Sequence, residues 1–203
     1  MGLKSGVSRA LLCGILLGCA TPAMAQFSDS YNFLKAVRDG NGDDAMKYLS
    51  KPGAPVLNTR DPATGETALH ISVKTHAVNW VGFLLNKGAN PDIKDRNGNT
   101  PLHDAALVGD PTSLTYLLGM KARVNATNNN GETPLILAVH RRDIDAVHLL
   151  IDAGADPKIQ DTIAGKSALD YAKQDSRLAP ILKVLEDSKA PPKKAVSGPV
   201  LGF

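Results

Sequence analysis

The five histidines are the side chains of this sequence best suited to metal binding, because imidazole is a common zinc ligand. His70 and His103 stand 33 residues apart in the same local sequence, whereas His76, His140 and His148 lie in other contexts. No His-Glu-x-x-His spacing occurs. Equal positions on stacked helices lie roughly 10 Å apart, one helix diameter, and zinc ligands must converge on one point. The sequence therefore predicts no metal site and no cofactor.

The run from Asp39 to Asp44 superficially resembles a calcium loop. It lacks the spaced pattern of such a loop and its closing Glu. We interpret it as a turn between two helices, in which Asp43 caps the second helix. The patterns of serine hydrolases, P-loops and dinucleotide-binding loops are absent from the sequence, so we expect no catalysis by the chain itself.

Four short boxes of the form Gly-x-Thr/Ser-Pro/Ala-Leu are spaced evenly along the chain. They begin at Gly65, Gly98, Gly131 and Gly165, which are 33, 33 and 34 residues apart. A fixed period near 33 predicts units that stack, because one such unit cannot bury its apolar face alone.

The second copy illustrates the elements expected in each unit. Thr100 can cap a first helix whose initial residue is Pro101, where the missing N–H costs nothing. The segment 109–111, Gly-Asp-Pro, ends that helix and starts a second one. Apolar residues at helical spacing predict the buried faces of both helices. These residues are Leu102, Ala105, Ala106, Leu114, Leu117 and Leu118.

The second helix of a unit is expected to end at a residue in the left-handed conformation, which favours glycine. Gly88 and Gly154 occupy this position in the first and third copies. Lys121 occupies it in the second copy, where a side chain costs about 1 kcal/mol.

The box Thr100-Pro101-Leu102-His103 and its spaced copies resemble the ankyrin repeat over about residues 30–187. This resemblance implies an all-α solenoid of stacked helix-turn-helix units with projecting turns. It also implies that His70 and His103 bond to backbone and tie neighbouring loops together. The predicted division is a signal peptide at 1–25, an ankyrin-repeat domain at 26–187 (N-cap about 30–60, repeats about 61–94, 95–127 and 128–160, C-terminal cap 161–187) and a disordered tail at 188–203.

The first 25 residues have the pattern of a secretory signal peptide. Two basic residues and a short apolar run precede Ala23-Met24-Ala25, a small-x-small cleavage site, so the mature chain would begin at Gln26. The apolar run is shorter than the roughly 20 residues that span a bilayer, and no longer run follows. An alternative uses Leu16-Leu17-Gly18-Cys19 as a lipobox, with lipid attached at Cys19 and a membrane-surface location.

The net charge bears on the class of partner, and the positions of the cysteines bear on disulfide and thiol chemistry. The formal charge of +3 falls to +1 without the leader, with 21 basic and 20 acidic residues, which gives no case for a nucleic-acid partner. Cys13 and Cys19, the two cysteines, both lie in the leader, so a chain cut after Ala25 has no disulfide or thiol chemistry.

In the ankyrin family, the turn tips and the exposed end of each first helix often form a concave protein-binding face. At the helix ends this face is polar in four of five units, and the central pair, Leu107-Val108, is apolar. An apolar centre inside a polar rim is the layout of a protein interface, although the pair could simply pack under adjacent turns. The predicted protein-binding residues are Lys74, Arg96, Asn97, Asn99, Leu107, Val108, Asn129, Asn130, Glu132, His140 and Arg141.

These observations predict a monomeric, non-enzymatic protein-binding module that acts in the bacterial periplasm or envelope. Two alternatives remain open at this point. One is an accessory factor that stabilises or activates a periplasmic enzyme, for example in stress defence. The other is a secreted factor that binds a host protein.

Overall fold

Helices account for most of the fold. The computed structural model describes residues 22–51 and 56–188, and its elements occur as helix pairs. The helices are α1 (Pro22–Arg38), α2 (Gly42–Leu49), α3 (Ala68–Lys74), α4 (Val78–Asn86), α5 (Pro101–Val108), α6 (Pro111–Gly119), α7 (Pro134–Arg141), α8 (Ile144–Asp152), α9 (Ala168–Gln174) and α10 (Ala179–Asp187), with a short 3₁₀ turn, η1 (Ser176–Leu178), before α10.

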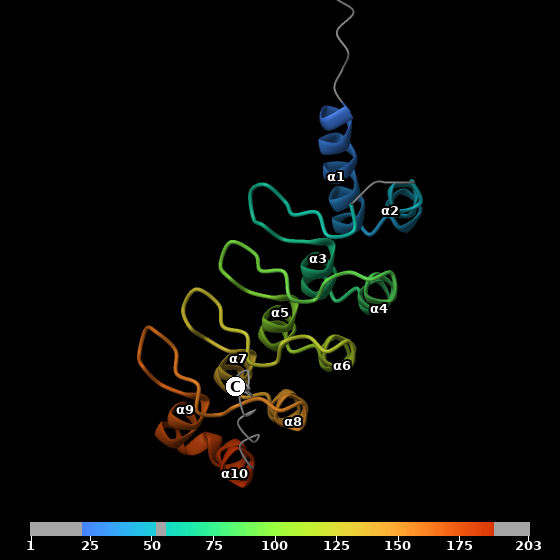
Figure 1. Cartoon of the computed structure of the whole chain (residues 1–203). Helices are drawn as coiled ribbons and strands as arrows, with labels where there is room; N and C mark the ends of the chain where they lie inside the picture. Colours follow the sequence, from blue (N-terminus) through green and yellow to red (C-terminus); the bar gives the residue numbers. More distant parts are fainter. Residues whose placement is uncertain (1–21, 52–55, 189–203) are drawn as a thin grey trace, which may run out of the picture.

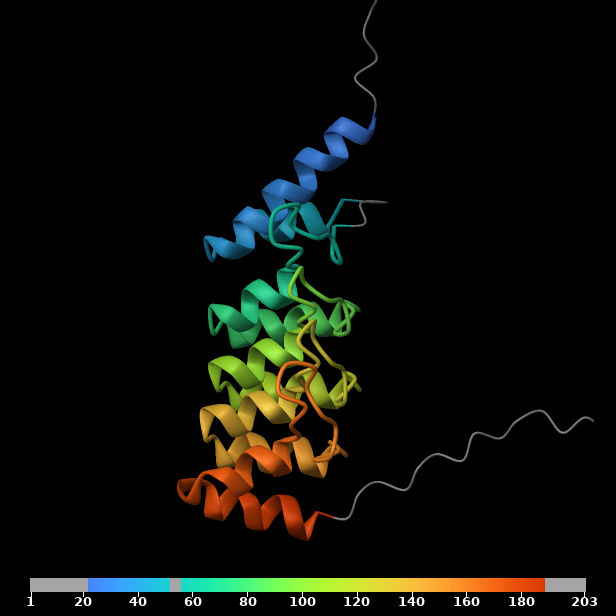
Figure 2. The same cartoon turned by 90° about the vertical axis from the view of Figure 1, so that its left-hand side faces the viewer.

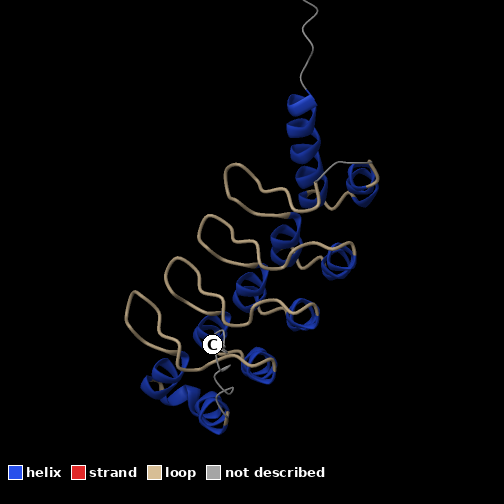
Figure 3. Cartoon of the chain, in the orientation of Figure 1, coloured by secondary structure: helices blue, strands red, loops and turns tan. Residues whose placement is uncertain are grey.

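The helices lie in two parallel columns (Figure 1). The odd-numbered helices form an inner column and the even-numbered helices an outer one. Each helix contacts its pair mate, and from α3 onward each also contacts the next helix of its own column. Long turns project from the inner column, away from the outer helices, and Figure 2 shows them side by side along the stack. Within the described residues no strand is present, only one isolated bridge (Figure 3). The predicted all-α solenoid with projecting turns is confirmed.

The core runs the length of the stack between the two columns. In the second repeat Leu102, Ala105, Ala106, Leu114 and Leu117 are fully buried. The alanines let α5 approach its neighbours closely, because their side chains add little volume. Leu118, also expected in the core, is half-buried and packs against it.

The junction of α5 and α6 forms as its residues predict. Pro101 is in the first turn of α5, and Gly109 ends the helix in the left-handed conformation with φ of 71°. Asp110 then caps α6, and its carboxylate accepts hydrogen bonds from the backbone N–H groups of Thr112 and Ser113. In the Gly-Asp-Pro segment, Gly109 therefore ends α5, and Asp110 and Pro111 begin α6.

The ends of the described stack differ from the sequence expectations. The first helix, α1, begins at Pro22, before the predicted N-cap region of about 30–60, so Ala23 and Ala25 of the predicted cleavage site lie in its first turn. The N-cap of α2 is Asn41 and not Asp43, since the Asn41 side chain accepts a hydrogen bond from the backbone N–H of Asp44. The prediction of Asp43 was wrong because the helix starts at Gly42, two residues before the first helical position that a cap at Asp43 would give.

The other predicted segments at the chain ends lie mostly outside the described residues. This applies to the leader up to residue 21, including Cys19, and to the tail from residue 189. The domain boundaries stay predictions, although α3 to α10 fall in pairs within the four predicted units.

Left-handed residues end the outer helices where the sequence predicted them. Gly88 and Gly154 have φ of 90°, and Lys121 has φ of 59°. Two further non-glycine residues, His76 (53°) and Arg142 (61°), adopt positive φ in the links between paired helices, where the second repeat has Gly109. The sequence analysis did not anticipate these two positions.

The conformation of Lys121 supports a specific prediction. Replacement Lys121→Gly should raise the free energy of unfolding by about 0.5–1 kcal/mol, because glycine adopts positive φ without strain. Urea unfolding of the two proteins measures the difference. The exposed Lys87→Gly serves as control, since Lys87 ends α4 in the right-handed conformation and the change should destabilise. A Lys121→Gly protein less stable than the wild type would contradict this account.

Candidate functional site

Two buried histidines link neighbouring repeats. The Nδ1 atom of His103 accepts a hydrogen bond from the backbone N–H of Thr100 (3.1 Å), and its Nε2 atom donates to the carbonyl of Glu132 in the next turn (3.1 Å). His70 bonds in the same way to Thr67 and to the carbonyl of Asn99. Both side chains are fully buried. The predicted tie between neighbouring loops is therefore confirmed.

Burial keeps these imidazoles neutral at pH 7. Loss of hydration lowers the pKa of His103 to about 4, and it lowers the pKa of His70 as well. A neutral ring with the proton on Nε2 can accept at Nδ1 and donate at Nε2 simultaneously, which matches the observed partners. Because both nitrogens are used within the fold, neither ring has a lone pair left for a metal ion.

The projecting turns also bond directly to one another. The backbone N–H of Arg96 donates to the Thr64 carbonyl (2.9 Å), and that of Asn129 donates to the Asn97 carbonyl (3.0 Å). The same bond recurs from Thr162 to Asn130 (2.8 Å). These bonds hold successive turn tips at a fixed spacing, so the face that they form is rigid.

An open hollow of about 790 Å³ lies between the turns and inner helices of the two central repeats. Eight of the eleven predicted binding residues line it, together with Asn128 and Leu137. The eight are Asn97, Asn99, Leu107, Asn129, Asn130, Glu132, His140 and Arg141. Their role in binding stays a prediction, but the fold brings them together.

Three predicted residues lie outside the hollow. Val108 is half-buried and packs against the core, which is the alternative that the sequence left open for it. The guanidinium of Arg96 bonds to the carbonyl of Pro62 in the preceding turn. Lys74 makes ion pairs on the neighbouring part of the concave face.

Two residues of the hollow were missed by sequence reasoning. The amide nitrogen of Asn128 donates to Asn99 and Glu132, so it joins two successive turns. Leu137 is 8% exposed and forms part of the apolar floor. The register could have identified Leu137, because it lies three residues before His140 and four before Arg141, on the same face of the helix.

A comparison of equivalent positions separates the central repeats from the outer ones. Each repeat has one such pair, formed by the residue after the box glycine and the residue eight positions later. The four pairs are Glu66 with Lys74, Asn99 with Leu107, Glu132 with His140 and Lys166 with Gln174. In the first and last repeats these residues bond to each other: Lys74 to Glu66 (2.8 Å) and Lys166 to Gln174 (2.8 Å). Within the described chain, no hydrogen bond or ion pair joins the central pairs, Asn99 with Leu107 and Glu132 with His140.

Leu107 is the exposed apolar centre of the hollow, with 51% of its surface accessible. Its backbone carbonyl accepts a hydrogen bond from the Arg141 guanidinium (3.2 Å), which also covers Gly109. Arg141 therefore stabilises the end of α5 as well as lining the hollow. His140 packs edge-on against the ring of Tyr171, with 4.4 Å between centroids.

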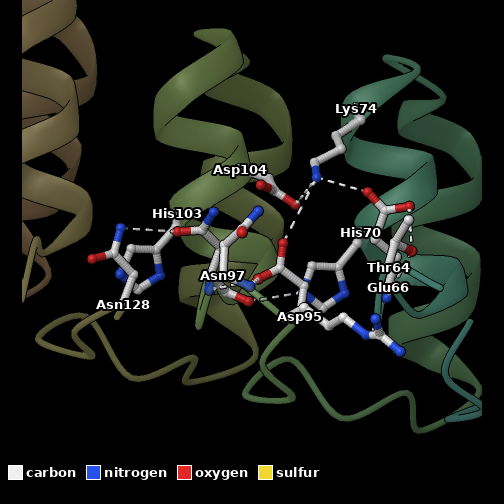
Figure 4. A network of polar contacts seen from close by, with 12 residues as sticks. Thr64, Glu66, His70, Lys74, Asp95, Asn97, His103, Asp104 and Asn128 are labelled. Atoms are coloured by element: carbon white, nitrogen blue, oxygen red, sulfur yellow. Dashed lines mark hydrogen bonds and ion pairs between the residues drawn. The ribbon is translucent and has the colours of Figure 1, made fainter. Parts of the chain in front are cut away.

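A polar network lies beside the hollow, between the first and second repeats (Figure 4). The Lys74 ammonium is 2.8 Å from Glu66, 3.5 Å from Asp104 and 3.9 Å from Asp95. The Asp104 side chain is fully buried. Desolvation raises the pKa of this carboxyl to about 7, against the smaller opposing effect of Lys74.

Neither a metal centre nor a membrane span is found in the described part of the chain. No three His, Cys, Asp or Glu side chains there are grouped so that they could hold a metal ion. None of the helices in residues 22–51 and 56–188 combines the length and apolar character needed to cross a bilayer.

Two family models match this chain, and both describe ankyrin repeats. The first, for three copies, covers residues 33–128, and the second, for many copies, covers residues 118–172. The chain therefore belongs to the ankyrin-repeat family. Members of this family are generally non-catalytic modules that bind other proteins.

Similar proteins occur in a bacterium and in vertebrates, and those named here match about 70% of this chain. An ankyrin repeat-containing protein of Treponema pallidum is 34% identical over 143 residues, which are 70% of this chain and 47% of that protein. The NF-kappa-B p105 subunit of Gallus gallus is 33% identical over 68% of this chain and 16% of its own length. A Danio rerio protein named as a palmitoyltransferase, ZDHHC13, is 36% identical over 68% of this chain and 21% of its own length. The chain thus spans half or less of these relatives.

The histidine link leads to a stability prediction. His103→Ala should lower the free energy of unfolding at pH 7 by about 2–4 kcal/mol, because it removes two buried hydrogen bonds and leaves a cavity. The loss should shrink as pH falls from 6.5 towards 4, since the wild type must then keep an imidazole neutral that is protonated when unfolded.

Denaturant unfolding at pH 7 and pH 4.5 measures both effects. The exposed His148 provides the matched control, and His148→Ala should change stability by less than about 0.5 kcal/mol. Equal stability losses for the two variants would show that the inter-repeat bond of His103 contributes nothing.

Proposed function

We propose that this chain is an exported, non-enzymatic module of the bacterial periplasm or envelope, which binds a partner protein through the hollow of its two central repeats. The proposal rests on a difference between the outer and the central repeats at two equivalent positions of the concave face. The outer repeats use them for internal bonds, whereas the central repeats leave Leu107 and His140 facing solvent.

The composition of the hollow supports a protein partner. Leu107 and the partly covered Leu137 supply an apolar centre. Asparagine amides and the Glu132 carboxylate surround it, and these groups can bond to main-chain and polar side-chain atoms of a partner. Such an arrangement of apolar centre and polar rim is typical of protein interfaces.

Rigidity favours binding at this face. Backbone bonds between Asn97 and Asn129, and between Asn130 and Thr162, fix the turns before any partner arrives. A preordered surface loses little conformational entropy on association. A standard interface needs about 800 Å² per partner, so contact would extend from the hollow to adjacent turns.

Export rests on the leader sequence, with its basic residues, apolar run and Ala23-Met24-Ala25 site. We propose cleavage after Ala25 and a monomeric periplasmic protein, with lipid attachment at Cys19 as the alternative. After cleavage, α1 would retain Gln26 to Arg38, whose Phe33, Ala36 and Val37 are buried against the stack.

The binding proposal is tested by crosslinked co-purification from the envelope fraction. Leu107→Asp should abolish capture of a partner that the wild type captures, because a charge would replace the apolar centre. Met120→Asp is the matched control: Met120 is similarly exposed (48% against 51%) and belongs to the same repeat, but it lies at the end of the outer helix α6.

Both variants must first melt within a few degrees of the wild type. Loss of the same partner with Leu107→Asp and its retention with Met120→Asp is the expected result. Retention of every partner by Leu107→Asp would place the interface elsewhere.

The processing proposal is tested by intact mass spectrometry of the protein isolated from its own cell envelope. The expected mass corresponds to a chain that begins at Gln26, without lipid. A chain that begins at Cys19 and carries acyl groups would replace the periplasmic assignment with a membrane-anchored one.

A further inference from the structure

Asp104 occupies a position that holds an aliphatic residue in the two neighbouring repeats and a tyrosine in the last one. The residue six positions after each box glycine is Ile71, Asp104, Leu137 and Tyr171 in successive units. Ile71 and Leu137, on the helices either side of α5, are both buried. A carboxyl group has thus been placed in an apolar row along the floor of the concave face, where it is fully buried.

The hydrogen-bonding capacity of Asp104 is not met by the fold. Within the described residues, neither carboxyl oxygen has a hydrogen-bond partner. The nearest opposite charge is the Lys74 ammonium, 3.5 Å from Oδ2. Lys74 makes its shorter contact with Glu66 (2.8 Å) and also lies 3.9 Å from Asp95, so three carboxyl groups surround one ammonium (Figure 4).

The remaining charged groups near α5 are committed to other contacts. On the α3 side, His70 is neutral and bonded at both ring nitrogens. On the α7 side, Arg141 bonds to the Leu107 carbonyl, and His140 packs on Tyr171. On the α6 side, the Asp110 carboxylate caps the helix and lies 3.9 Å from the His76 ring. Lys74 is therefore the cation that responds to the charge of Asp104.

A buried carboxyl beside one shared cation changes charge at an unusual pH. Burial favours the neutral form, and the negative charges of Asp95 and Glu66 add to this effect, whereas Lys74 opposes it. The resulting pKa of about 7 means that Asp104 exchanges its proton near neutral pH. Lys74, whose side chain is 35% exposed, lies between this carboxyl and solvent.

We propose that Asp104 and Lys74 form a proton-linked latch on the concave face. When Asp104 is ionised, its carboxylate attracts the Lys74 ammonium towards the floor of the concave face. When Asp104 takes up a proton from solvent, that attraction is lost, and the ammonium, now held by Glu66 and Asp95 alone, is more easily drawn to an anionic group of a bound partner. The latch is a property of the free protein, and only its use in partner binding rests on the proposed function.

Titration of the free protein tests the first step. In carbon-detected NMR of the full chain, the Asp104 carboxyl should titrate with a midpoint near 7, whereas a solvent-exposed Asp titrates near 4. Lys74→Met should move this midpoint upward by removing the cation. Lys166→Met is the matched control, because Lys166 bonds to Gln174 at the equivalent position of the last repeat, and the midpoint should not move.

Chemical acetylation tests the second step. At pH 8.5, acetic anhydride should modify Lys74 several-fold more slowly, relative to Lys166 of the same molecule, in the wild type than in Asp104→Asn. Ionised Asp104 favours the unreactive ammonium form in the wild type alone. At pH 5.5, where Asp104 is protonated, the two proteins should give the same ratio. If the wild type and Asp104→Asn gave the same ratio of Lys74 to Lys166 acetylation at pH 8.5 as well as at pH 5.5, the latch would be overturned.

A second variant guards against misfolding of Asp104→Asn. Asp104→Leu installs the residue that Leu137 already provides in the next repeat, and it should fold and give the same acetylation result. It should also melt above the wild type by a margin that widens as pH rises from 4 through 7. A raised carboxyl pKa stabilises the fold at low pH, and that stabilisation is lost as pH rises through the folded value. A margin independent of pH would contradict the proposal.

These outcomes separate the latch from the partner-binding proposal. Titration near 4 in the free protein would exclude the latch and leave the Leu107 interface untouched. Conversely, retention of every partner by Leu107→Asp would not alter the titration of Asp104.

Discussion

The hydrogen bonds between successive turns are the interactions on which the rest of this structure depends. A single helix pair buries only part of its apolar surface, so each unit is stable only against its neighbours. The bonds from Arg96 to Thr64, from Asn129 to Asn97 and from Thr162 to Asn130 set the offset of one unit on the next. His70 and His103 reinforce the first two junctions from inside. In the third repeat Ile136 replaces the histidine, and this junction relies on the backbone bond and apolar packing.

Rigid spacing of the turns also brings equivalent side chains of successive repeats onto one face. The same two concave positions recur in every repeat, and their side chains decide whether the surface is closed or open. Glu66 with Lys74 and Lys166 with Gln174 satisfy each other at the two ends. In the centre, an exposed leucine and a histidine stand in place of such partners, and the hollow forms there. The repeat therefore supplies a uniform scaffold, while a few substitutions leave one part of it open as the hollow.

Asp104 illustrates how a repeat fold can hold an unfavourable group. Its neighbours in the row, Ile71 and Leu137, show that an apolar residue fits this position. Among the residues that the structure describes, the carboxyl has no hydrogen-bond partner, and it depends on a lysine that it shares with Glu66 and Asp95. A stack in which stability is distributed over many junctions can tolerate one such site. The cost is a group whose charge changes in the physiological pH range.

The sequence by itself determined the architecture, because period and box chemistry act locally. The spacing of Gly65, Gly98 and Gly131, the Thr-Pro helix start and the left-handed end at Lys121 depend on neighbours within a few residues. Local rules also located most of the concave residues, since each repeat places equal positions on one face. They failed at α2, where the cap lies two residues earlier than predicted, at Asn41 and not at Asp43.

Only the tertiary structure decided which concave residues are open and which are engaged. Arg96 bonds to the preceding turn, Lys74 joins a network drawn from two repeats, and Val108 packs against the core. These contacts join residues about one repeat apart or set depth in the core, and neither is encoded in any short segment. The protonation of Asp104 is of the same kind, because burial and a shared cation arise only when two units are stacked.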